Sequence, residues 1–98
     1  TLFRSVHRRL RPGAPFVVAH HSFPQSGGAK ATWLARFAAF AAASGMSNVT
    51  PETAAAMGER LPVLSPEQDE KLMREAGFVD VALFYAAFTF RGWVGYRT

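Results

Sequence analysis

The 98-residue chain contains no cysteine and no apolar run long enough to cross a membrane. Without cysteine it forms neither disulfides nor thiolate metal sites, and its redox compartment cannot be inferred from thiol usage. The most apolar stretch, residues 29–45, carries Arg36 and is shorter than the roughly 20 apolar residues that a membrane span needs. The first residues also lack the apolar segment of a secretory signal. We therefore expect a cytoplasmic protein with no membrane contact.

The chain also lacks the features that would make its positive charge a nucleic-acid signal. Its net charge is +4, and four arginines fall within residues 4–11. No aromatic residues alternate with these arginines, so the pattern is typical of a solvated helix face and does not favour a nucleic-acid partner. A metal site is not expected either. His20 and His21 are adjacent in a predicted strand and point to opposite faces, and no third ligand lies close in sequence.

A helix followed by a strand is predicted at the start of the chain. Apolar residues recur at helical spacing at Leu2, Phe3, Val6 and Leu10. Pro12 cannot continue a helix and Gly13 can adopt a positive φ, so the chain is expected to turn there and to enter a strand over residues 15–20. This strand is apolar on both faces, which is typical of a parallel sheet covered by helices on both sides.

Another helix, followed by two strands, is predicted at the end of the chain. Ser65 is suited to be the N-cap, Pro66 to the first helical position, and Gln68 completes a capping box. Gly77 is suited to the position beyond the helix end. The buried face is expected to contain Leu72, Met73 and Ala76. The solvated residues are expected to be Glu67, Asp69, Glu70, Lys71 and Glu75.

Strands are predicted over residues 79–83 and 89–96, and their link is too short for a parallel crossover, so the pair should be antiparallel. Between the two halves, residues 29–44 have apolar residues at helical spacing, with Gly45 as the stop. A shorter helix begins after Thr50 and runs to about Arg60.

Two short sequence motifs lie where a predicted helix ends and a predicted strand begins. They are Leu10-Arg11-Pro12-Gly13 and Glu75-Ala76-Gly77-Phe78. As a pair they resemble the C-terminal half of class I S-adenosylmethionine-dependent methyltransferases, in which a similar phrase precedes each of two late strands. The resemblance implies an α/β fold, the C-terminal part of a Rossmann-like doubly wound sheet. That part would contain one parallel strand and a C-terminal antiparallel pair, whose last strand enters between its neighbours, together with an inserted helical lid.

The resemblance also implies how the chain is organised and what it binds. Residues 1–98 would be a single partial domain, with a helix and strand in 1–21, the helical lid in 22–64, and a helix and two strands in 65–98. The implied cofactor is S-adenosylmethionine. The glycine-rich loop and the acidic ribose partner of such a site are absent from this chain. No cofactor-binding residue is therefore assigned here, and those residues are expected upstream of Thr1.

Candidate substrate-binding residues follow the first strand, because open α/β sheets bind ligands at the carboxyl ends of their strands. They are His20, His21, Ser22 and Phe23. Either histidine is a candidate general base, since imidazole titrates near neutral pH; alternatively, one is buried and hydrogen-bonded and the other exposed. Trp33 and Phe37 are candidates to line an apolar pocket from the lid, although aromatic residues at helical spacing are also typical of a core.

Two functions are compatible with these features. In the first, the chain is the substrate-side portion of a methyltransferase that acts on an unidentified acceptor, most simply a small molecule, and is inactive alone. In the second, it is a non-catalytic association module that forms a homodimer through an exposed strand edge or an aromatic hairpin. The hairpin aromatics are Phe84, Tyr85, Phe88, Phe90 and Trp93.

Overall fold

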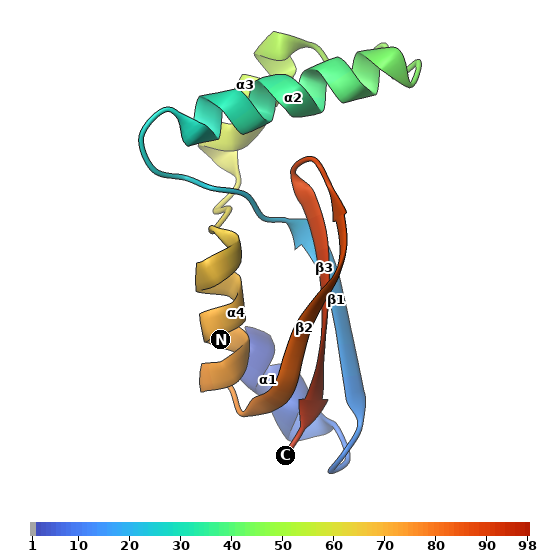
Figure 1. Cartoon of the computed structure of the whole chain (residues 1–98), viewed down its shortest axis with the longest axis vertical. Helices are drawn as coiled ribbons and strands as arrows, with labels where there is room; N and C mark the ends of the chain where they lie inside the picture. The colour runs from blue at the N-terminus through green and yellow to red at the C-terminus, as the bar shows by residue number, and fades with distance from the viewer. Residues whose placement is uncertain (1) are drawn as a thin grey trace.

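The computed structural model describes residues 2–98, and in this range it has four helices and a three-stranded antiparallel sheet (Figure 1). The elements are α1 (Leu2–Arg9), β1 (Pro15–His21), α2 (Ala29–Ala43), α3 (Pro51–Arg60), α4 (Pro66–Glu75), β2 (Phe78–Ala87) and β3 (Phe90–Arg97). Each predicted helix and strand is present. β2 continues beyond the predicted range of 79–83, so the final hairpin is longer than expected.

The sheet has the order β1-β3-β2, with β3 antiparallel to both neighbours. Val18 pairs with Trp93 on one side of β3, and Ala82 pairs with Val94 on the other. The last strand therefore lies between the other two, as expected. The expected parallel strand is not seen as a parallel pair within residues 2–98: β1 and β2 run in the same direction, but β3 separates them.

The two faces of the sheet differ in their cover. Helices α1 and α4 pack on one face (Figure 1), where Phe3, Met73, Phe78 and Trp93 form the buried core. The opposite face presents exposed apolar side chains at Val17, Val79, Tyr85 and Tyr96. Val17 is 60% exposed, so the expectation that the first strand is covered on both sides is wrong for this chain. Exposed and half-buried residues alternate along β1 because helices cover only one face of the sheet, although the residues on both faces are mostly apolar.

The helix ends follow the local signals in the sequence. The Ser65 hydroxyl accepts a hydrogen bond from the backbone N–H of Gln68, and the Gln68 side chain accepts one from the backbone N–H of Ser65. Thr50 caps α3 in the same reciprocal way. Gly77 after α4 has a φ of 106°, and Gly45 after α2 has a φ of 82°. The predicted caps and stops are confirmed.

Helices α2 and α3 pack against each other and lie past one end of the sheet, next to the turn between β2 and β3 (Figure 1). One contact with this turn is the stacked pair of Phe40 and Phe88, whose ring centroids are 4.8 Å apart. The molecule is elongated, since its radius of gyration is 15.1 Å, whereas a compact domain of this length has about 13 Å. The α2–α3 pair therefore projects from the sheet.

Within the described part of the chain, no helix combines the length and the apolar character needed to cross a lipid bilayer.

Candidate functional site

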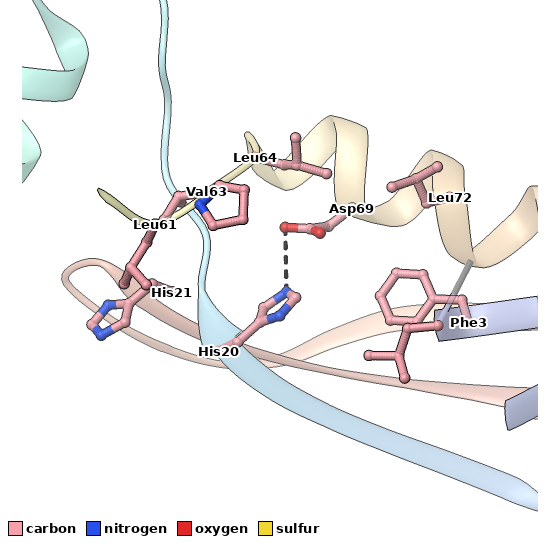
Figure 2. Close-up of a pocket in the computed structure, with 10 residues that line it drawn as sticks. Phe3, His20, His21, Leu61, Val63, Leu64, Asp69 and Leu72 are labelled. Carbon is pink, nitrogen blue, oxygen red and sulfur yellow. Dashed lines mark ion pairs between the residues drawn. The ribbon is translucent and has the colours of Figure 1, made fainter. Parts of the chain in front are cut away.

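A cavity of about 470 Å³ lies beside the carboxyl end of β1 (Figure 2). It is open to solvent and is bordered by α1, β1, α4 and the segment 61–64 that joins α3 to α4. Its lining residues are Leu2, Phe3, His20, His21, Leu61, Pro62, Val63, Leu64, Asp69 and Leu72. Most of this lining is apolar, and neither lysine nor arginine belongs to it. A mostly apolar cavity with a few convergent polar groups is the usual character of a small-molecule site.

His20 brings the first of these polar groups into the cavity. It lies on the same face of the sheet as Trp93, and the two rings meet edge-on with centroids 5.9 Å apart. Its Nε2 atom is 3.4 Å from Oδ2 of Asp69 (Figure 2). This distance is short enough for an ion pair when the imidazole is protonated. In the orientation seen, Nε2 is buried and has no hydrogen-bond partner within the described residues.

Asp69 provides the second polar group, from α4. Its side chain is buried, and Oδ2 accepts a hydrogen bond of 2.6 Å from the Ser22 hydroxyl. The prediction that Asp69 is solvated is wrong. It stands four residues before the buried Met73, so the same helix face carries both. The signal that could have identified it was this spacing, which places a carboxylate in line with Met73 and Ala76.

The environment of the imidazole indicates which of its nitrogens carries a proton. A neutral imidazole has one N–H, and a lone pair on Nε2 facing the Asp69 carboxylate would be repelled. We therefore assign the N–H of neutral His20 to Nε2, which lies 3.4 Å from Asp69 without the geometry of a hydrogen bond. The lone pair is then on Nδ1. In this form the Nδ1 lone pair of His20 can accept a hydrogen bond or a proton.

His21 has a different environment from His20. Its Nδ1 is 3.0 Å from the hydroxyl oxygen of the buried Thr89, and its ring meets Phe37 and Phe90 edge-on. Burial lowers the pKa of His21, and the adjacent His20 lowers it further. His21 borders the cavity, but its contacts mainly join α2 to the β2–β3 turn. The two histidines therefore point to opposite faces, as expected, and have different surroundings.

The other predicted site residues surround the cavity without lining it. Ser22 and Phe23 are buried, and the backbone N–H of Phe23 donates to the carbonyl of Leu64. The Trp33 ring has two guanidinium groups at 4.8 and 5.0 Å from its centroid. They belong to Arg36 and Arg91.

Arg91 and Phe37 hold the projecting helices to the sheet. Arg91 donates a hydrogen bond to the carbonyl of Ser22. Burial lowers the pKa of Arg91, with Glu67 acting in the opposite direction. Phe37 packs on His21. The segment 61–64 falls within the predicted lid range of 22–64 but outside its helices, and it provides the cavity wall that had been expected from Trp33 and Phe37.

The described residues do not fit the implied methyl donor. The turn after β1 contains Gly27 and Gly28 but not the G-x-G-x-x-G spacing of a dinucleotide-binding loop, and the Asp69 carboxylate is occupied by Ser22 and faces His20. Within residues 2–98 no three histidine or carboxylate side chains are grouped to hold a metal ion. The arrangement is suited to binding an apolar molecule and to accepting one proton from it.

No protein-family model matches this chain, and no curated protein matches it significantly.

Proposed function

We propose that this chain is the substrate-side portion of an S-adenosylmethionine-dependent methyltransferase, in which His20 takes a proton from the methyl acceptor. The observation that carries the proposal is the His20–Asp69 pair in an apolar cavity at the end of β1. The strand order β1-β3-β2 supports it, because the resemblance implies a last strand that enters between its neighbours. The donor supplies an electrophilic methyl group, and its binding residues are proposed to lie outside this chain.

Each side chain has a defined part in this proposal. The apolar walls hold the acceptor beside His20, and such positioning lowers a reaction barrier. His20 accepts the acceptor's proton on Nδ1. Asp69 keeps the imidazole oriented, and Ser22 keeps Asp69 oriented through the bond of 2.6 Å. Asp69 and Ser22 are positioning residues, because neither needs to touch the acceptor.

The test is transfer of labelled methyl groups from S-adenosylmethionine by the protein as its natural source makes it, over a panel of acceptors. We expect His20→Gln to lower kcat by about 100-fold or more, because a general base contributes at least that factor. His7→Gln is the matched control, since His7 lies on α1 and does not line the cavity. We expect the 98-residue chain alone to bind no donor in calorimetry. Absence of transfer by the natural protein, or an undiminished rate in His20→Gln, would contradict the proposal.

A second function is favoured by the uncovered sheet face and by the unpaired edge of β1. β1 pairs only with β3, so its other edge is open within the described residues. A flat apolar edge of this kind is suited to association with a second copy.

Sedimentation of the chain over a range of concentrations distinguishes the two functions. If the chain is a non-catalytic association module, we expect a stable dimer whose formation does not depend on S-adenosylmethionine. Val17→Lys should dissociate this dimer, because a charge on the exposed strand opposes pairing. Met46→Lys is the control, since Met46 is similarly exposed but lies beyond α2. A monomer under all conditions contradicts the second function.

A further inference from the structure

We propose that the cavity beside His20 binds a neutral, largely apolar molecule with one acidic hydroxyl group, a phenol or an enol, whose hydroxyl donates a hydrogen bond to Nδ1 of His20. This inference rests on the proposed function and names the chemical class of its acceptor. It is carried by the composition of the cavity wall, the absence of basic groups from it, and the buried carboxylate behind the imidazole.

The charge of the wall excludes anionic acceptors. Among residues 2–98, Asp69 is the only formally charged residue that lines the cavity, and its carboxylate is buried. A carboxylate or phosphate on the ligand would meet this negative charge with no lysine or arginine on the wall to compensate it. Burying such a ligand charge without a compensating cation costs roughly several kcal/mol of binding free energy. Nucleotides and carboxylic acids are therefore disfavoured.

The shape and polarity of the wall favour a ring system. Leu61, Leu64, Leu72 and Phe3 approach the cavity from different sides (Figure 2). A volume of about 470 Å³ is within the range of small-molecule sites. Apolar surface buried against these side chains provides binding free energy without any polar partner. One polar group of the ligand can then be satisfied by His20.

The acid–base chemistry selects a hydroxyl of moderate acidity. A phenol has an ordinary pKa of about 10, so its hydroxyl donates a stronger hydrogen bond to a neutral imidazole than an aliphatic hydroxyl does. An aliphatic alcohol is far less acidic and gains little from such a base. An ammonium group has no lone pair to present, and it would also compete with the imidazolium for Asp69. Proton transfer leaves an oxyanion on the ligand and an imidazolium on His20 whose Nε2 faces the Asp69 carboxylate, so the total charge of the site is unchanged and the imidazolium offsets one of the two negative groups.

Binding to the 98-residue chain, without any methyl donor, tests the inference. The probes are 2-naphthol, naphthalene, which lacks the hydroxyl, and 2-naphthoate, which carries a charge in place of it. Tryptophan fluorescence reports occupancy, because the Trp93 ring lies 5.9 Å from His20. We expect 2-naphthol to bind up to about ten-fold more tightly than naphthalene, the value of one net hydrogen bond. We expect 2-naphthoate to bind more weakly than either.

Two variants separate the role of His20 from the shape of the cavity. His20→Phe keeps an aromatic ring but removes the acceptor, so the affinities for 2-naphthol and naphthalene should become equal. His7→Phe should leave their ratio unchanged, since His7 does not line the cavity. Long-range ¹H–¹⁵N spectra of the imidazole give a second readout, in which 2-naphthol should shift Nδ1 more than Nε2.

Several outcomes would overturn the inference: no binding of 2-naphthol, an equal or tighter affinity for 2-naphthoate, or a hydroxyl preference that survives in His20→Phe. These outcomes differ from failure of the proposed function. Methyl transfer to an acceptor of another class, with no preference for 2-naphthol, would retain the function and reject the acceptor class. The expected naphthol preference, in a protein that transfers no methyl group, would retain the binding site and reject the methyltransferase.

Discussion

The protonation state of His21 is linked to the packing of α2 on the sheet, because the His21 ring contacts α2. Its ring lies between Phe37 of α2 and Phe90 of β3, and it shares a hydrogen bond with the buried Thr89. Burial lowers the pKa of His21, with His20 contributing, so the folded protein binds this proton less tightly than the unfolded chain does. Protonation therefore favours unfolding.

We predict that stability decreases as the pH falls below the unfolded pKa of His21, which is 6.5. Above that pH the contribution of His21 to the free energy of unfolding does not change with pH. The decrease ends once the pH lies below the lowered pKa of His21 in the folded state. Urea unfolding between about pH 7.5 and about pH 4.5 measures it. His21→Gln retains a partner for Thr89 and should have a flatter profile. An identical pH dependence in the two proteins would show that His21 is not responsible.

At the scale of elements, the end of α4 requires a glycine for two separate reasons. Gly77 has a φ of 106°, which disfavours any residue with a Cβ. A Cβ built at this position would also lie 2.8 Å from Nε2 of His7 on α1. Gly45 after α2 has a positive φ of 82° but no atom within 4 Å of such a Cβ. Comparing alanine substitutions at Gly45 and Gly77 therefore distinguishes the cost of backbone strain from the cost of steric crowding.

We predict that Gly45→Ala lowers the free energy of unfolding by about 1 kcal/mol, from backbone strain alone. Gly77→Ala should lower it by about 1–2 kcal/mol more, because His7 must move away from its contact with Phe78. Thermal unfolding followed by circular dichroism gives both values, at roughly 4–8 °C per kcal/mol for a domain of this size. Equal losses at the two positions would mean that His7 moves aside without cost.

At the scale of the whole molecule, the projecting α2–α3 pair is held to the sheet by a small set of side-chain contacts. These are the stacking of Phe40 on Phe88, the packing of Phe37 on His21, and the Arg91 guanidinium over Trp33. The segment 61–64 connects this pair to α4 and also forms one wall of the cavity. Movement of α2 and α3 would therefore change access to His20.

We predict that Phe40→Ala lowers the free energy of unfolding by about 0.5–1.5 kcal/mol, the usual value of an aromatic pair. The same change should speed hydrogen exchange within residues 29–60 while α4 and β3 stay protected, and it should raise the radius of gyration in small-angle scattering. Met46→Ala removes an exposed apolar side chain outside this contact and is the control. Unchanged exchange in residues 29–60 would show that the Phe40–Phe88 pair does not hold the lid.

The sequence alone was sufficient to predict each helix and strand and the ends of the helices, but not the length of β2. Ser65 with Gln68, Thr50 with Pro51, and Gly77 act within one helical turn, so their effects depend on neighbouring residues. Apolar spacing similarly identified the buried faces of α1 and α4, except that Leu2 is 71% exposed and Asp69 is buried. His20 and His21 were singled out for the same reason, since they end a strand.

Only the tertiary structure decided what these elements bring together. The Ser22–Asp69 bond joins residues 47 positions apart, and it placed a carboxylate that was expected in solvent beside the imidazole of His20. The tertiary structure also decided that one face of the sheet is left uncovered and that segment 61–64, not Trp33, lines the cavity. Such contacts depend on the summed burial of many distant side chains, whereas a cap or a stop depends on a few adjacent ones.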